Sequence, residues 1–167
     1  RGAGLADYAR FVRFSHTLFS LPLILAGMLI AARGWPDLRT LLLILAAAFG
    51  ARTAALALNR IIDRAIDARN PRTAARELPS GRLSLPQAWG LTGAAVVLYV
   101  AAAALLGPLT LALAPIPLVV FTAYPYLKRF TPLCHLGVGL GLALSPLGGW
   151  VAVTQSLADL SEVLPLA

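Results

Sequence analysis

Charge is scarce in this sequence, and so is cysteine. Only 13% of the 167 residues are charged and 59% are hydrophobic, whereas a typical soluble domain is about 25% charged. This balance excludes an ordinary soluble domain and indicates an integral membrane protein. Cys134 is the only cysteine, which excludes an intrachain disulfide and a cysteine cage for zinc. The sequence also lacks a glycine-rich phosphate loop, a nucleophile elbow and any zinc-ligand spacing.

Long apolar runs dominate what is there. Five segments are long enough to cross a hydrocarbon core, which takes about 20 helical residues. None alternates with period two, so helices are predicted rather than the strands of a barrel. The predicted spans are Phe14–Ala32, Leu41–Leu58, Ala88–Leu106, Leu109–Leu127 and Leu133–Val153. The fold class is therefore an all-α, polytopic transmembrane helical bundle, with the start of a sixth helix expected after Val153. We expect residues 1–167 to form a single domain that is incomplete at its C-terminal end.

Proline and glycine punctuate these runs. Gly107-Pro108 is predicted to form a tight turn, which would make the third and fourth spans an antiparallel hairpin. Prolines within spans can kink helices beside an internal cavity, although ordinary bundle packing also accommodates them. The prolines concerned are Pro22, Pro115, Pro117 and Pro146.

The basic residues are distributed asymmetrically along the chain. If the chain zigzags through the bilayer, eleven of the 14 fall on one side: Arg1, Arg10, Arg13, Arg60, Arg64, Arg69, Arg72, Arg76, Arg82, Lys128 and Arg129. Arg33 and Arg39 fall on the other side, and Arg52 lies inside a span. The positive-inside rule then predicts a cytoplasmic N-terminus and two cytoplasmic loops. The net charge of +7 is thus explained by basic loops that face anionic lipid or an anionic substrate. No nucleic-acid partner is expected.

Carboxylates and arginines gather where the second span ends. Carboxylates bind divalent cations and guanidinium groups bind phosphate oxygens, so the mixture suggests a metal–diphosphate site at the bilayer surface. Helical periodicity aligns four residues in one stripe from the membrane interior to its surface: Arg52, Asn59, Asp63 and Asp67. An intramembrane arginine usually faces the bundle interior beside a partner. The alternative is a helix whose charges pair with one another among the headgroups, which would explain neither Arg52 nor Asn59.

The loop that follows supplies further arginines. Asn70-Pro71 is predicted to end the helix, and Arg72 and Arg76 precede the turn Leu78-Pro-Ser-Gly81. Two arginines beside two carboxylates neutralise each other unless a polyanion and a cation lie between them. A diphosphate with Mg²⁺ fits, because Mg²⁺ takes one or two carboxylates and completes its shell with phosphate oxygens and water.

Tyr124 and Lys128 stand four residues apart at the end of the fourth span, and Lys128 is the only lysine. They can be interpreted as a hydrogen-bond donor and a phosphate contact. They are equally typical of an aromatic belt with a snorkelling lysine at a membrane interface.

Taken in order, these motifs resemble those of the UbiA-type intramembrane aromatic prenyltransferases, over essentially the whole chain. The matching residues are Arg52, Asn59, Asp63, Asp67, Arg72, Arg76, Leu78-Pro-Ser-Gly81, Tyr124 and Lys128. The resemblance implies Mg²⁺-dependent transfer of a polyprenyl group from its diphosphate to an aromatic acid within the lipid bilayer of a bacterial inner membrane. It favours a functional role for Tyr124 and Lys128.

The resemblance also implies roles. Asp63 and Asp67, helped by Asn59, would hold Mg²⁺ against the diphosphate, and with Lys128 they are the predicted catalytic residues. The residues predicted to bind the diphosphate are Arg52, Asn59, Arg72, Arg76, Tyr124 and Lys128.

The chain departs from the family pattern in two ways. Arg60 stands where the family usually has an aspartate, which removes one potential metal ligand. The family's second aspartate-rich motif would lie beyond Ala167, so we expect the chain to be inactive alone.

The subgroup and the function class leave alternatives. The segments Ser15–Pro22 and Asn59–Asp63 resemble those of 4-hydroxybenzoate polyprenyltransferases, and similar segments occur in enzymes of the futalosine route to menaquinone. A transporter or channel could use Arg52, Asp63 and Asp67 along an ion path, but it predicts acids deep within several spans. A non-catalytic prenyltransferase remnant is the third alternative.

Overall fold

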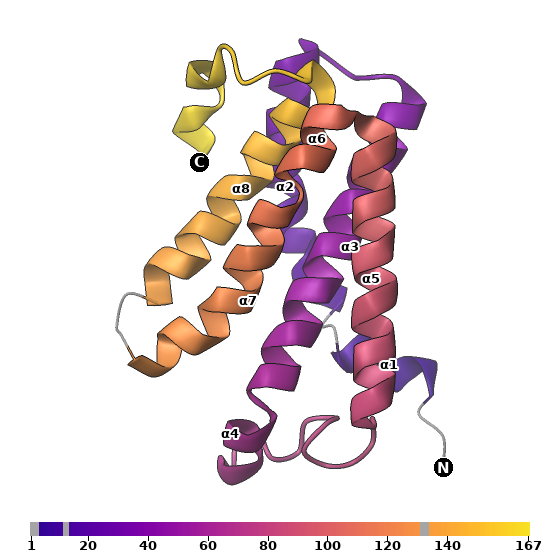
Figure 1. Cartoon of the computed structure of the whole chain (residues 1–167), viewed down its shortest axis with the longest axis vertical. Coiled ribbons are helices and arrows are strands. Elements are labelled where there is room, and N and C mark those ends of the chain that lie inside the picture. The colour runs from indigo at the N-terminus through magenta and orange to yellow at the C-terminus, as the bar shows by residue number, and fades with distance from the viewer. Residues whose placement is uncertain (1–3, 12–13, 131–133) are drawn as a thin grey trace.

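The structure is a computed structural model, and it describes residues 4–11, 14–130 and 134–167. Within these ranges the side chains of residues 5, 6, 14–20, 128–130, 134–136 and 138 lie outside the description. The described secondary structure is helical throughout (Figure 1). The α-helices are α1 (Leu5–Phe11), α2 (Phe14–Ala32), α3 (Leu38–Ile62), α4 (Arg64–Arg69), α5 (Leu85–Leu106), α6 (Pro108–Leu113), α7 (Pro115–Phe130) and α8 (Cys134–Thr154). Two short 3₁₀ helices follow, η1 (Leu160–Glu162) and η2 (Leu164–Leu166).

The helices confirm the predicted transmembrane bundle. Within the described residues, three stretches are long and apolar enough to cross a membrane: Leu38–Ile62, Leu85–Leu106 and Pro108–Leu127. Two shorter apolar stretches, Leu21–Ala32 and Gly139–Thr154, belong to α2 and α8.

The start of a sixth helix was predicted after Val153, and the structure has two short 3₁₀ helices there. The segment after α8 forms η1 and η2 rather than a turn of α-helix. Asp159 there has a left-handed backbone with φ of 56°, and Pro165 has no N–H group to donate. The left-handed residue separates this segment from α8, and a proline is tolerated in the first turn of a helix such as η2.

Helix α3 lies at the centre of the bundle, between α5 and α7 (Figure 1). Helices α2 and α8 form a second packed pair. Both pairings need a residue without a side chain at the crossing. A Cβ on Gly50 would lie 2.8 Å from the Ala95 carbonyl oxygen of α5, and a Cβ on Gly27 would overlap the Pro146 carbonyl of α8. Small residues let the helix backbones approach closely, as is common in membrane bundles.

Short polar signals set where the long helices begin. Asp37 caps α3, because its carboxylate accepts from the Thr40 N–H at 3.1 Å and from the Thr40 hydroxyl at 2.6 Å. Ser84 and Gln87 form a capping box at the start of α5, each side chain bonding to the backbone N–H of the other. Such caps satisfy N–H groups that have no partner within the helix.

The fourth predicted span is present as the apolar stretch Pro108–Leu127, and it is interrupted between α6 and α7. The tight turn at Gly107-Pro108 is present, but α6 ends at Leu113 and α7 begins at Pro115. Pro115 and Pro117 cannot donate helix hydrogen bonds, so the chain changes direction here. The Tyr99 hydroxyl of α5 donates to the Ala114 carbonyl at 3.2 Å. Beyond the break α7 packs against α3 and α8, so the predicted hairpin with α5 is limited to the turn and α6.

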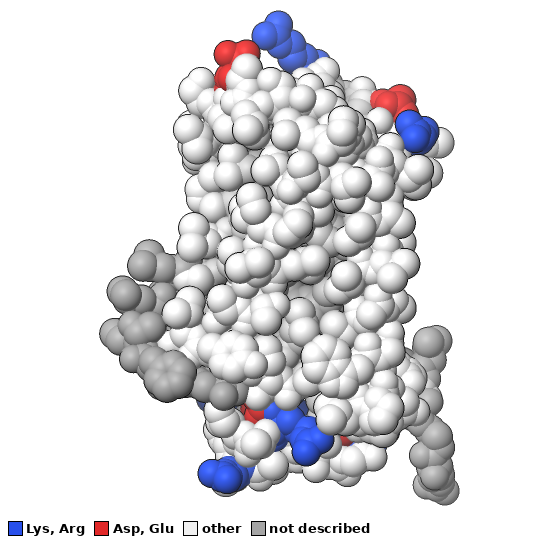
Figure 2. Space-filling view, viewed as in Figure 1, with Lys and Arg blue, Asp and Glu red and all other residues white. Residues whose placement is uncertain are grey.

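Among the described residues, charged side chains gather at the ends of the bundle, and Arg52 within α3 is the exception. In Figure 2 they gather at the top and bottom, and the wall between them is uncoloured. The α2–α3 connection and η1 lie at one end, whereas α1, α4 and residues 70–84 lie at the other (Figure 1). This is the arrangement expected of a protein whose wall contacts hydrocarbon and whose ends contact water.

Candidate active site at the end of helix α3

Helix α3 ends in two buried carboxylates. Asp63 ends α3 and precedes α4: its N–H donates to the Asn59 carbonyl at 3.0 Å, and its carbonyl accepts from the Asp67 N–H at 2.8 Å. The side chains of Asp63 and Asp67 belong to residues that are 2% and 7% exposed. A buried carboxylate is costly unless it is compensated, so this end of α3 is a specialised part of the fold.

Three of the predicted site residues line one internal cavity. Arg52 and Asn59 of α3 and Tyr124 of α7 border a cavity of about 330 Å³. Its other walls are apolar: Ala55, Leu56, Phe121, Gly137, Gly141 and Leu142. A second cavity of about 110 Å³ shares Arg52, Phe121 and Gly141 with the first and is lined mostly by apolar residues. Arg52 therefore borders both cavities.

The predicted phosphate-binding arginines line a different hollow. Arg72 and Arg76 border a polar space of about 680 Å³, together with Arg10, Arg60, Thr73, Ala75 and Glu77. Asn70 ends α4, and its side-chain oxygen accepts from the Arg72 N–H at 3.0 Å, as the predicted helix end at Asn70-Pro71 requires. Five of the eight predicted residues thus border two separate spaces, Arg52, Asn59 and Tyr124 in one and Arg72 and Arg76 in the other. Asp63 and Asp67 are buried at the end of α3 and in α4.

A direct ion pair links the acidic and basic members of the site. Arg76 Nη1 lies 2.7 Å from Asp67 Oδ2. The Thr73 hydroxyl donates to the Asp67 carbonyl at 2.9 Å, which fixes the loop against α4. In this state Arg76 compensates the charge of Asp67, and the loop with both arginines is held beside the end of α3.

The chemistry of the donors bears on a metal ion. Within the described residues, histidine, cysteine, aspartate and glutamate form no group of three or more that could hold a metal. Asn59, Asp63 and Asp67 offer an amide oxygen and two carboxylates. This set fits Mg²⁺ in kind, because Mg²⁺ is usually bound through one or two carboxylates together with substrate phosphates and water.

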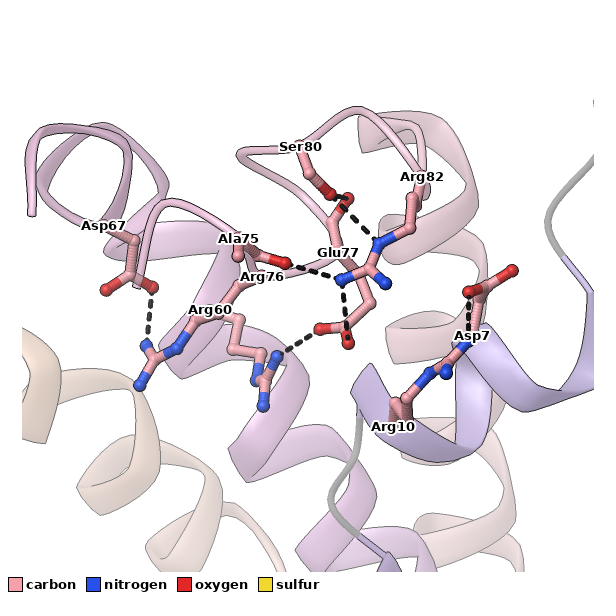
Figure 3. Close-up of polar contacts among 9 residues, drawn as sticks. All are labelled: Asp7, Arg10, Arg60, Asp67, Ala75, Arg76, Glu77, Ser80 and Arg82. Atoms are coloured by element: carbon pink, nitrogen blue, oxygen red, sulfur yellow. Dashed lines mark hydrogen bonds and ion pairs between the residues drawn. The ribbon is translucent and has the colours of Figure 1, made fainter. Parts of the chain in front are cut away.

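Sequence reasoning missed one component of the site, the ion pair between Arg60 and Glu77 (Figure 3). Arg60 Nη1 donates to Glu77 Oε2 at 2.6 Å, and the two residues are 8% and 5% exposed. The Arg60 guanidinium also lies 5.5 Å from the ring centroid of Phe11 in α1. The available signal was that Glu77 is the third acidic residue, after Asp63 and Asp67, in a loop rich in arginine.

Lys128 lies within α7, but its side chain is outside the described part of the chain. Its predicted pairing with Tyr124 and its phosphate contact therefore stay predictions. The same holds for the predicted site roles as a whole, which rest on residue chemistry and placement.

Comparison with known proteins decides the family. The sequence model of the UbiA prenyltransferase family matches residues 20–167. The chain belongs to the UbiA prenyltransferase family.

Relatives of known name agree with this assignment. The chain is 30% identical to a 4-hydroxybenzoate octaprenyltransferase of Aeromonas hydrophila, over all of this chain and 58% of the relative. It is 33% identical to an enzyme of that name from Vibrio cholerae, over 94% of this chain and 56% of the relative. The chain therefore spans a little more than half the length of these relatives.

Solved structures show the same fold. The apo structure of a UbiA homolog from Aeropyrum pernix K1 matches with a TM-score of 0.80 and 42% identity, over 92% of this chain and 56% of that one. A digeranylgeranylglyceryl phosphate synthase matches with a TM-score of 0.83 at 22% identity, over 97% of this chain and 59% of that one. The all-helical architecture of this chain is thus that of UbiA proteins.

Proposed function

We propose that the protein containing this chain transfers a polyprenyl group from its diphosphate to an aromatic acid such as 4-hydroxybenzoate. The reaction would be Mg²⁺-dependent and would supply respiratory quinone biosynthesis. One observation carries the proposal: Arg52, Asn59 and Tyr124 border a cavity whose other walls are apolar, and a second, largely apolar cavity shares Arg52 with it. A ligand with a polyanionic head and a long apolar tail fits such an arrangement.

The arginines account for the leaving group. Breaking an allylic C–O bond leaves the negative charge on diphosphate, so donors that neutralise this charge lower the barrier. Arg72 and Arg76, which border a polar hollow, would perform this task, with Lys128 as a further candidate. When a diphosphate arrives, Arg76 can exchange its bond to Asp67 for bonds to phosphate. That exchange would free the Asp67 carboxylate, which with Asp63 would hold Mg²⁺; the ion would supply further neutralising charge.

The apolar walls account for the other half of the reaction. The allylic carbocation must be kept from water until the aromatic ring attacks it. Phe121 and Tyr124 border the cavity, and aromatic faces attract cations. Arg52 offers a guanidinium group to an acidic substituent of the acceptor or to the diphosphate.

The transporter alternative fits less well. It predicts carboxylates deep within several spans. Among the described residues the acidic side chains lie outside the membrane-spanning stretches, in α1, the connections, α4 and η1.

The test uses the full-length protein in membranes, with a polyprenyl diphosphate and radiolabelled 4-hydroxybenzoate. We expect prenyl transfer that a chelator abolishes and added Mg²⁺ restores. Asp63→Ala and Asp67→Ala should each lower the rate at least about a hundredfold, since removing groups that stabilise transition-state charge costs on that order. Glu162→Gln, at the opposite end of the bundle, should transfer normally. Undiminished turnover in the Asp63 and Asp67 variants would refute the site.

A further inference from the structure

The loop between α4 and α5 is organised around one buried carboxylate. Both oxygens of Glu77 face guanidinium groups: Oε2 accepts from Arg60 at 2.6 Å, and Oε1 lies 3.8 Å from Arg82 Nη2. The Glu77 carbonyl accepts from the Leu83 N–H at 3.0 Å and from the Ser80 hydroxyl at 3.4 Å. Glu77 therefore ties the turn at 78–83 to itself and ties the loop to the last turn of α3.

The partner of Glu77 is itself held from the far side. Arg60 is buried, and Phe11 of α1, which is fully buried, covers its guanidinium at 5.5 Å. A guanidinium over an aromatic face is a favourable contact. Three elements, α1, α3 and the loop, thus meet at one charge pair. Arg60 does not serve as the metal ligand that an aspartate at this position would be; its side chain contacts the loop instead.

The pair adjoins the residues proposed to bind the diphosphate. Arg76 and Glu77 are consecutive, and Figure 3 shows their side chains pointing in different directions, Arg76 toward Asp67 and Glu77 toward Arg60. Arg60 and Glu77 also border the same hollow as Arg72 and Arg76. Any shift of Glu77 away from α3 would move Arg76 with it.

We propose that the Arg60–Glu77 pair is a positioning device that sets the place of the Arg72 and Arg76 guanidinium groups. This inference rests on the proposed function, in which those two groups bind the substrate diphosphate. Energetics favours a positioning role. Desolvating two charges offsets most of their attraction, so a buried pair adds little net stability compared with apolar residues of the same size. The pair instead fixes the orientation of the Arg60 and Glu77 side chains, because a short charge-assisted hydrogen bond joins them.

The first test is steady-state kinetics of the full-length protein in membranes, comparing Glu77→Gln with the matched control Glu162→Gln. We expect Glu77→Gln to raise the KM for the polyprenyl diphosphate on the order of tenfold, the effect typical of losing an orienting partner. The KM for the aromatic acceptor should change little, and Glu162→Gln should behave as wild type. A wild-type KM for the diphosphate in Glu77→Gln would overturn the proposal.

A double variant separates positioning from stability. Arg60→Met with Glu77→Leu removes both charges and keeps apolar bulk, so its unfolding temperature should stay near that of wild type even if Glu77→Gln fails to fold. Its KM for the diphosphate should nevertheless stay raised. Recovery of the wild-type KM in the double variant would show that the pair does not position the arginines and would overturn the proposal.

A second readout does not need activity. Trypsin cleaves after arginine, so cleavage of the detergent-solubilised protein after Arg69, Arg72 or Arg82 reports how firmly the loop is held. We expect faster cleavage in Glu77→Gln and in the double variant, and slower cleavage of wild type when Mg²⁺ and inorganic diphosphate are added. Equal cleavage in all three proteins would overturn the proposal. If wild type shows no transfer, the proposed function fails, whereas the cleavage pattern still decides whether the pair holds the loop.

Discussion

The two ends of this bundle treat charge differently. At the end formed by α1, α4 and the loop, four charged residues are less than a tenth exposed: Arg60, Asp63, Asp67 and Glu77. At the opposite end, Asp37, Arg39, Asp159 and Glu162 are all exposed. That end is fastened instead by a neutral amide, Gln155, whose side chain accepts from the Leu109 N–H at 3.2 Å and donates to the Thr110 hydroxyl at 2.6 Å.

This difference between the two ends distinguishes contacts that join helices from groups available to bind a ligand. Joining helices needs only neutral hydrogen bonds, which contribute net stability without the desolvation of ions. The charges buried at the other end lose their hydration, and the attraction between paired charges offsets this desolvation penalty only in part. Gln155 shows that this fold can join helices through neutral hydrogen bonds. The buried charges at the other end therefore need a further explanation. The proposed binding of a polyanionic headgroup would supply that explanation.

The strongest challenge to this comparison is to remove an arginine from each end. Arg76→Ala takes away a charge-assisted bond to phosphate, worth about 1.5–3 kcal/mol, so kcat/KM for the polyprenyl diphosphate should fall about ten- to a hundredfold. Arg39→Ala removes an exposed guanidinium that donates to the Leu105 carbonyl at 3.2 Å, and it should leave kcat/KM unchanged. Prenyl transfer in membranes measures both, and similar losses in the two variants would refute the division between the ends.

The regular helical parts of this structure could be predicted well from the sequence. The predicted span Phe14–Ala32 coincides with α2, and Arg52 and Asn59 line one cavity as their spacing of seven within a continuous helix predicted. Helical periodicity is informative only while the helix lasts. Because α3 ends at Ile62, the position of the loop arginines could not be extrapolated from it.

One feature could not be predicted and another could be predicted only in part, for physical reasons. Arg60 and Glu77 are 17 residues apart across an irregular loop, and no periodicity relates residues that an irregular backbone brings together. The break between α6 and α7 was predicted only in part, because a kink at Pro115 or Pro117 was expected but a new helix beginning at Pro115 was not. A proline inside an apolar run reads equally as a kink or as a new helix start, and packing of α7 against α3 and α8 decides between them.

Gln155 offers an intermediate test at the fastening end. Gln155→Ala leaves the Leu109 N–H and the Thr110 hydroxyl without their partner, which should cost about 1–3 kcal/mol of unfolding free energy. Gln155→Glu keeps an acceptor for Leu109 and should lose less. Thermal unfolding in detergent measures the change, and prenyl transfer at permissive temperature should be retained. Loss of transfer without loss of stability would mean that this end also takes part in binding.

The smallest effect is expected at Asp37, where a charge caps a helix in full contact with solvent. The Thr40 hydroxyl and N–H bond to the Asp37 carboxylate and lower its pKa below the ordinary value. A carboxyl whose pKa is lower in the folded state stabilises the fold above its unfolded pKa, and this contribution is lost as the pH falls through the folded value. Asp37→Ala should therefore lower the unfolding temperature slightly near neutral pH, and the difference from wild type should vanish in acid. Thr40→Val, which removes the hydroxyl donor but keeps the N–H, should lower it less than Asp37→Ala. If the difference persisted in acid, Asp37 would act through packing rather than through its charge. That result would weaken the contrast between a solvent-exposed cap at this end and buried ion pairs at the other.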